Sequence, residues 1–239
     1  PGEKLYEELL MSEEGLTAIV SNTFLAQTYE YDQNNELDKQ YQGSYVKVLM
    51  AAAQSSGVSP YILASKILTE IGKTEPSQIV SGTYPGYEGY YNFYNWGAYG
   101  SNPVSAGLET AKKEGWNSRA TAIIGGAQKL ANGYVNDKQD TYYYMDFNVI
   151  KKPYYSHQYA AAAYDAFNKS SNLSKTYQDY TSAPLVFSIP VYTSIPDALA
   201  TKPSAGDQRY NNYYLTSMTA EGLTTQFDMY VNNYTMNIS

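Results

Sequence analysis

The sequence contains no cysteine and a single histidine among its 239 residues. Without cysteine the chain has no disulfide, no thiol nucleophile and no zinc site of the Cys/His type. A serine triad would depend on His157, and no Gly-x-Ser-x-Gly nucleophile elbow accompanies it. We therefore expect a structural or supporting role for His157, and we expect no metal and no organic cofactor.

Basic side chains are few, and long apolar runs are missing. The chain carries 16 lysines and arginines against 23 acidic residues, which gives a formal net charge of −7. Nucleic acid is not an expected partner, because phosphate binding requires clustered basic groups. No run approaches the roughly 18 apolar residues of a membrane-spanning helix.

Tyrosine is the residue type in excess, with 28 copies against 6 phenylalanines and 2 tryptophans. A tyrosine ring offers a flat apolar face and a polar edge. Most of these rings are expected to pack between the core and the solvent. The excess over phenylalanine nevertheless favours a hydrated aromatic surface, to which a sugar or a peptide would bind.

Helical patterns dominate the first 180 residues. Capping residues, proline at a first helical position and glycine at the ends predict the boundaries of the helices. A stretch without helical periodicity, rich in Gly, Tyr, Pro and Asn, predicts a long functional loop with or without a hairpin. The expected helices cover 44–56, 59–72, 102–115, 118–133 and 159–167; the loop covers 73–101; a strand or extended arm covers 141–150.

The composition changes after about residue 170. Residues 181–207 contain four prolines and predict an extended linker. Residues 208–239 alternate in the manner of strands. We therefore predict a first domain over 1–180, a linker over 181–207 and a partial β module over 208–239.

One carboxylate stands out on the second of these helices. Leu63, Ile67 and Glu70 share one helical face at i, i+4 and i+7. Glu70 should therefore emerge at the edge of the core, in the last helical turn, where the dipole disfavours negative charge. The apolar surroundings and the helix dipole both favour the protonated form of the carboxyl group, which a general acid for glycosidic cleavage requires. The alternative is a solvated glutamate at a frayed helix end, paired with Lys66 or Lys73.

Six blocks of sequence, in order, resemble one known family. They cover 69–72, 80–99, 107–116, 122–128, 139–145 and 157–160. Together they resemble glycoside hydrolase family 73, the bacterial endo-β-N-acetylglucosaminidases. The resemblance implies an α+β, mainly helical, lysozyme-like fold with a long loop or small β-lobe over the cleft. It also implies cleavage of peptidoglycan after N-acetylglucosamine, with Glu70 as the proton donor.

The second catalytic group stays open at this point. A glycosidase usually places another group opposite the acid. Glu88, on a glycine-flanked loop, is the best carboxylate, and Glu75 and Asp146 are weaker candidates. The alternative is a substrate-assisted route, in which the 2-acetamido group of the sugar attacks the anomeric carbon. Tyr159, in the block at 157–160, is then the residue that would orient that group.

Four residues of the loop are candidates for sugar contact: Asn92, Phe93, Trp96 and Tyr99. Aromatic faces stack on pyranose rings, and an asparagine amide both donates and accepts hydrogen bonds. For Phe93 and Trp96, burial in the core beneath the loop is the competing interpretation. Many members of the family that the chain resembles have glycine where this chain has Asn95, so the local backbone and the direction of Trp96 differ from the family pattern.

Together with these observations, the resemblance implies a secreted peptidoglycan hydrolase at the cell wall or cell surface, monomeric, with glycan strands as its partner. One rival is a lytic transglycosylase or muramidase on the same fold. Another is a peptidoglycan-binding surface module without catalysis. The segment 184–239 resembles the start of a cadherin-like or bacterial Ig-like β module, and no catalytic role is expected there.

Overall fold

The computed structural model describes residues 12–159, 169 and 171, and the backbone of three strands between 213 and 238. Its contacts divide the chain into two units, one made of 1–133 with 173–184 and one made of 134–172 with 185–239. The domain boundaries expected from composition stay a prediction. Among the described residues, no helix has the length and the apolar character needed to cross a membrane.

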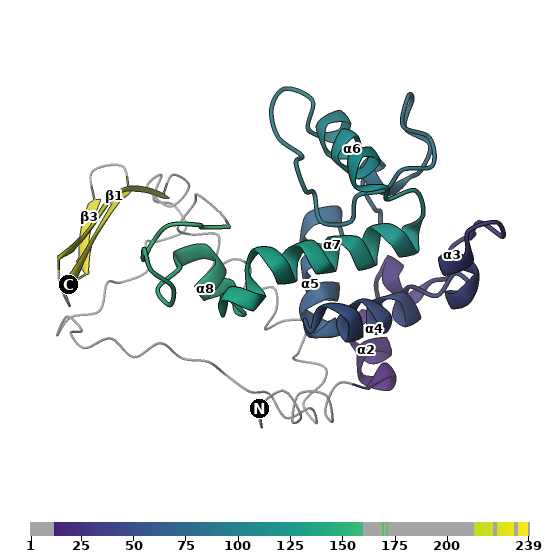
Figure 1. Cartoon of the computed structure of the whole chain (residues 1–239), viewed down its shortest axis with the longest axis horizontal. Coiled ribbons are helices and arrows are strands. Elements are labelled where there is room, and N and C mark those ends of the chain that lie inside the picture. The colour runs from purple at the N-terminus through teal and green to yellow at the C-terminus, as the bar shows by residue number, and fades with distance from the viewer. Residues whose placement is uncertain are drawn as a thin grey trace. The chain divides into compact units, whose positions relative to one another are not determined.

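The first unit is a packed set of helices (Figure 1). Helix α4 (Tyr45–Ser56) packs along α7 (Arg119–Gly133), and both α4 and α5 (Pro60–Ile71) contact α2 (Glu13–Val20). The mainly helical fold class expected from the sequence is confirmed. The elements are α2 (Glu13–Val20), η1 (Phe24–Ala26), α3 (Glu36–Tyr41), α4 (Tyr45–Ser56), α5 (Pro60–Ile71), η2 (Gln78–Val80), α6 (Pro103–Glu114) and α7 (Arg119–Gly133).

Local sequence signals determine where these helices begin and end. The Ser44 hydroxyl accepts a hydrogen bond from the Lys47 amide at the start of α4. Asn102 caps α6 in the same way, and Gly115 ends that helix in the left-handed conformation. The start of α5 differs from expectation, because Ser59 makes no side-chain cap and Pro60 alone marks the first turn.

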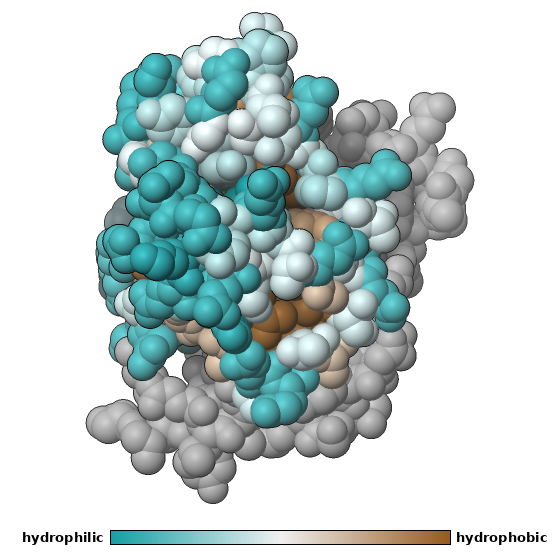
Figure 2. Space-filling view, turned by 90° about the vertical axis from the view of Figure 1, so that its right-hand side faces the viewer, coloured by the Kyte–Doolittle hydropathy of each residue, from teal (hydrophilic) through white to brown (hydrophobic). Residues whose placement is uncertain are grey.

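The core lies between α4, α5 and α7. Its fully buried side chains are mostly aliphatic: Val48, Leu49, Leu63, Ile67, Ile123 and Leu130. The face seen in Figure 2 is largely hydrophilic, and hydrophobic side chains reach it mainly in small hollows. The fold therefore relies on aliphatic burial and not on cross-links, as the absence of cysteine requires.

Residues 73–101 form a long loop that contains η2 and several turns but no strand. The loop is tied to the helical unit by backbone hydrogen bonds, from Asn92 N to Ile79 O and from Tyr91 N to Trp116 O. The prediction of a loop is confirmed, and of the two alternatives the one without a hairpin is correct.

In the second unit, the expectation of a strand or arm at 141–150 is wrong, because α8 (Tyr142–Phe147) occupies it. The Thr141 hydroxyl caps this helix by accepting from the Tyr144 amide, and Asn148 ends it in the left-handed conformation. The aromatic run resembles a strand by composition, but its capping residues determine the outcome. The element η3 (Val135–Asp137) precedes it.

The C-terminal strands β1 (Tyr213–Glu221), β2 (Thr224–Val231) and β3 (Tyr234–Ile238) form an antiparallel sheet in the order β1-β2-β3. The strand character predicted for this segment is confirmed. The linker expected at 181–207 and most of the helix expected at 159–167 lie outside the described residues.

Candidate active site

Glu70 lies where its helical spacing predicts. It is the penultimate residue of α5, and its side chain is 21% exposed at the edge of the core. Leu63 and Ile67, on the same face, are fully buried. The carboxylate is therefore held against an apolar surface while one side remains open to solvent.

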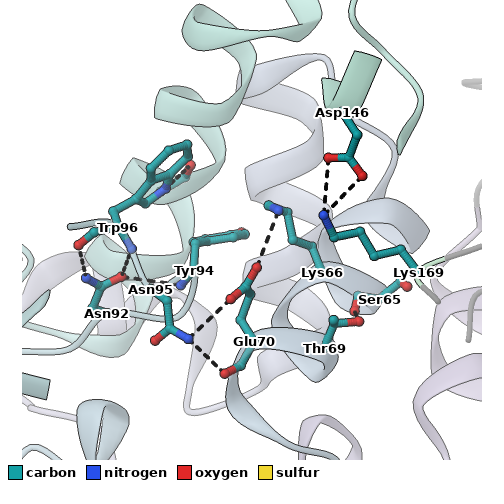
Figure 3. A network of polar contacts seen from close by, with 11 residues as sticks. Ser65, Lys66, Thr69, Glu70, Asn92, Tyr94, Asn95, Trp96, Asp146 and Lys169 are labelled. Carbon is teal, nitrogen blue, oxygen red and sulfur yellow. Dashed lines mark hydrogen bonds and ion pairs between the residues drawn. The ribbon is translucent and has the colours of Figure 1, made fainter. Parts of the chain in front are cut away.

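Each carboxylate oxygen of Glu70 has a polar partner (Figure 3). The ammonium group of Lys66 lies 3.7 Å from Oε1, and the Asn95 amide nitrogen donates to Oε2 at 3.2 Å. The Lys66 side chain is only 2% exposed. The pairing that the sequence offered as the alternative is thus present. Its lysine is buried, however, so the pair is a fixed feature and not a solvated contact.

Asn92 supports the loop from within. Its amide nitrogen donates to Trp96 O at 2.8 Å and to Gly107 O at 2.9 Å, while its oxygen accepts from the Trp96 amide at 3.1 Å. The residue is fully buried. Because its polar atoms hold backbone, we assign Asn92 to the attachment of the loop to α6 and not to direct sugar contact.

Phe93 also lies in the core, fully buried and edge-on to Tyr45. The competing interpretation for Phe93, burial beneath the loop, is the one that the structure shows. Trp96 is half-buried, and its ring nitrogen donates to Gly126 O at 3.3 Å. Tyr99 is 78% exposed. Of the four candidates for sugar contact, Trp96 and Tyr99 therefore keep surface that a ligand can reach.

Tyr94, which the sequence did not single out, anchors the loop to α7. Its hydroxyl donates to Ile123 O at 3.1 Å, and burial raises the pKa of this phenol. Its ring lies directly on the backbone of Gly126, where an added Cβ would stand 2.2 Å from a ring carbon. The Gly125–Gly126 pair in a helix was the available signal, since glycine costs helix stability unless a neighbour needs the space.

Glu88 lies at the surface of the loop. Its carboxylate accepts from the Gly86 amide at 3.1 Å. The backbone amide of Glu88 itself, followed by that of Gly86, holds the pKa of this carboxyl below its usual value. Glu88 is therefore a carboxylate at neutral pH, a form that suits a base or a nucleophile. Glu75, just beyond α5, is exposed.

Tyr159 belongs to the second unit. Its backbone amide donates to Met145 O at 2.8 Å, and the Lys169 ammonium group lies 5.1 Å from the centre of its ring. The same ammonium group donates to both oxygens of Asp146 at 3.2 Å. Asp146 is 2% exposed, so it serves a buried ion pair. His157 stacks on Tyr134, which agrees with a supporting role.

The residues described by the structure contain no group of three or more His, Asp or Glu side chains able to hold a metal ion. What the first unit does contain is one carboxylate fixed by a buried cation and an amide, next to a loop with exposed aromatic rings. In a mainly helical fold, this arrangement defines a candidate glycosidase of the lysozyme-like class.

Comparison with known proteins leads to the same class. No family model matches the chain. The Bifunctional autolysin of Staphylococcus epidermidis is 33% identical over 150 residues, which cover 59% of this chain and 11% of that protein. The Beta-N-acetylglucosaminidase of Bacillus subtilis is 33% identical over 152 residues, which cover 61% of this chain and 16% of that protein.

Solved structures agree with these relatives. A catalytic mutant of S. aureus Autolysin E, in complex with the disaccharide NAG-NAM, superposes with a TM-score of 0.53 and 28% identity. The match covers 71% of this chain and 68% of that chain. Autolysin E in complex with the muropeptide NAM-L-ALA-D-iGLU gives the same values.

The resemblance to the glucosaminidases of glycoside hydrolase family 73 is confirmed by these similarities in sequence and in fold. The autolysin fold also confirms the lysozyme-like, mainly helical class. The chain spans 11% and 16% of the length of the two curated relatives.

Proposed function

We propose that the chain is a peptidoglycan hydrolase of the endo-β-N-acetylglucosaminidase type, with Glu70 as its general acid. The observation that carries this proposal is the two-sided hold on the Glu70 carboxylate, by Lys66 at 3.7 Å and Asn95 at 3.2 Å. A catalytic carboxyl group must be fixed within reach of the scissile oxygen. The similar Autolysin E structure supports the assignment, because its catalytic mutant replaces a glutamate by alanine.

The bond proposed for cleavage is the β-1,4 link between N-acetylglucosamine and N-acetylmuramic acid. Glu70 gives its proton to the oxygen that leaves with the next sugar, and the bond from that oxygen to the anomeric carbon breaks. The carboxylate left behind is stabilised by the buried Lys66 ammonium group. A water molecule then completes the reaction at the anomeric carbon and returns a proton to Glu70.

A second group is proposed to assist on the side of the anomeric carbon opposite the acid. In the substrate-assisted route the acetamido oxygen attacks the anomeric carbon, and the Tyr159 hydroxyl orients the acetamido group. In the carboxylate route Glu88 acts as base or nucleophile, for which its ionised form is suited. We favour the substrate-assisted route because Glu88 lies fully at the surface, where solvent screens its charge.

The proposed place of action is the cell wall, reached by secretion, with glycan strands as the partner of a monomeric enzyme. The names of the relatives support the cell wall and its glycan strands as the target: they are autolysins and a glucosaminidase, and Autolysin E is in complex with a disaccharide and with a muropeptide. Trp96 and Tyr99 are proposed as the rings that meet the sugars.

Zymography on purified cell walls tests the acid. Glu70→Gln should abolish clearing, with a loss of about 10²-fold or more in rate. Glu75→Gln is the matched control, since Glu75 is an exposed glutamate just beyond the same helix, and it should clear like the parent. Parent-like clearing by Glu70→Gln would refute the proposal.

Analysis of the new ends of the glycan strands tests which glycosidic bond is cleaved. A reducing-end N-acetylglucosamine is expected in the products of wall digestion. An anhydromuramic end would identify a lytic transglycosylase, and a reducing-end N-acetylmuramic acid would identify a muramidase. If the folded parent protein does not clear the walls, the function would be that of a peptidoglycan-binding module without catalysis.

A further inference from the structure

Asn95 has an unusual backbone conformation for a residue with a side chain. Its φ is +52°, in the left-handed region that glycine enters most easily and asparagine next. It occupies the position where many members of the family that the chain resembles have glycine. Glycine can therefore form the same backbone turn. The turn alone does not explain why this chain has an asparagine side chain here.

That side chain makes two hydrogen bonds to one residue (Figure 3). The amide nitrogen donates to the backbone oxygen of Glu70 at 2.9 Å and to Glu70 Oε2 at 3.2 Å. An amide nitrogen carries two hydrogens, so it can serve both acceptors. The backbone oxygen lies in the last turn of α5, where carbonyl groups lack partners within the helix.

We propose that Asn95 is a positioning residue for the catalytic acid: it ties the side chain of Glu70 to the backbone of the same residue and so selects one orientation of the carboxylate. This inference rests on the proposed role of Glu70 as the acid. Asn95 acts through Glu70 and does not itself touch the substrate.

The position of Asn95 is set by its neighbours in the loop. The backbone oxygen of Asn95 accepts a hydrogen bond from the Ala98 amide at 3.0 Å. The backbone amide of Trp96, the next residue, donates to the side-chain oxygen of the buried Asn92 at 3.1 Å. Tyr94, the residue before it, is almost completely buried. The amide is therefore carried by a loop segment that is anchored on both sides, which a positioning group requires.

Lys66 and Asn95 approach the carboxylate from different sides, as Figure 3 shows. Lys66 contributes a charge to Oε1, and Asn95 contributes a directed hydrogen bond to Oε2. Loss of the amide should leave the charge in place and release the rotation of the carboxylate. The expected defect is therefore in kcat, with little effect on KM.

The decisive variant is Asn95→Gly, because glycine accepts the positive φ and removes only the amide. We expect kcat to fall about tenfold and KM to stay within about twofold. Asn95→Asp keeps the backbone and brings a second carboxylate beside Glu70, so it should lower kcat further.

Thermal melting and circular dichroism establish that each variant is folded. A folded Asn95→Gly with the kcat of the parent would overturn the inference, as would an Asn95→Asp that is as active as the parent. An inactive Glu70→Gln beside a normal Asn95→Gly defeats only the role of Asn95. An active Glu70→Gln instead defeats the proposed function itself.

Discussion

Lys66 is a buried cation whose ammonium group lies 3.7 Å from the carboxylate of Glu70, one helical turn further along α5. A lysine this deep in a protein loses most of its hydration, and it is retained where a negative partner compensates. Glu70 is partly open to solvent while Lys66 is not. The positive charge beside the Glu70 carboxylate therefore lies on its core side.

Replacing Lys66 by methionine should lower kcat by about 10²-fold, because the carboxylate formed on proton transfer loses its cation. Methionine keeps much of the buried volume, so the variant should fold. Initial rates on soluble peptidoglycan fragments measure the effect, and Lys73→Met provides the control, since Lys73 is exposed beyond the end of α5. Equal losses in the two variants, or none in Lys66→Met, would contradict the role.

A pair of substitutions distinguishes the roles proposed for Glu88 and Tyr159. If the sugar acetamido group is the attacking group, Tyr159→Phe should lose about 10²-fold or more in kcat, and Glu88→Gln should lose less than about tenfold. NMR of the first product reports the anomer and so distinguishes retention from inversion. The reverse order of losses would favour the carboxylate route through Glu88.

The contact between Tyr94 and Gly126 predicts an effect on the stability of the fold. Gly126→Ala places a methyl group against the Tyr94 ring and should destabilise the fold by about 1–3 kcal/mol. Gly133→Ala, in the same helix, meets no atom within 4 Å and should be neutral or stabilise by up to about 1 kcal/mol. Urea denaturation of both variants measures the difference, and equal midpoints would contradict it.

Alkaline pH should also destabilise the protein through its buried tyrosines. Burial raises the pKa of Tyr94, so its contribution is fully present below the unfolded value of about 10 and is lost as the pH rises above it. Burial acts in the same direction on the pKa values of Tyr29 and Tyr45.

Tyr94→Phe tests this part of the pH dependence. At neutral pH it should lose about 0.5–1.5 kcal/mol with the hydrogen bond to Ile123. Its further loss of stability between about pH 9 and about pH 11 should be smaller than that of the parent, because one ionisable group is gone. Parallel curves for the two proteins in urea titrations would show that Tyr94 does not contribute.

Several features followed from the sequence because their causes are local. Caps, an N-terminal proline and terminal glycines lie within a few residues of the helix ends they determine, so α4, α5, α6 and α7 were predictable. The spacing from Leu63 to Glu70 placed the carboxylate at the edge of the core. The glycine-rich composition of 73–101 predicted a loop for the same reason, since such residues disfavour regular structure wherever they occur.

Other features depended on contacts between distant residues. Asn92 and Phe93 have the chemistry of sugar-binding residues, and only packing against α6 and α4 placed them inside the protein. The helix α8 was missed because an aromatic run satisfies either a strand or a helix until its caps and neighbours are in place. The sequence by itself determined that a carboxylate would stand at the end of α5. Its partner Asn95 lies 25 residues away, so only the folded loop decided which groups would hold that carboxylate.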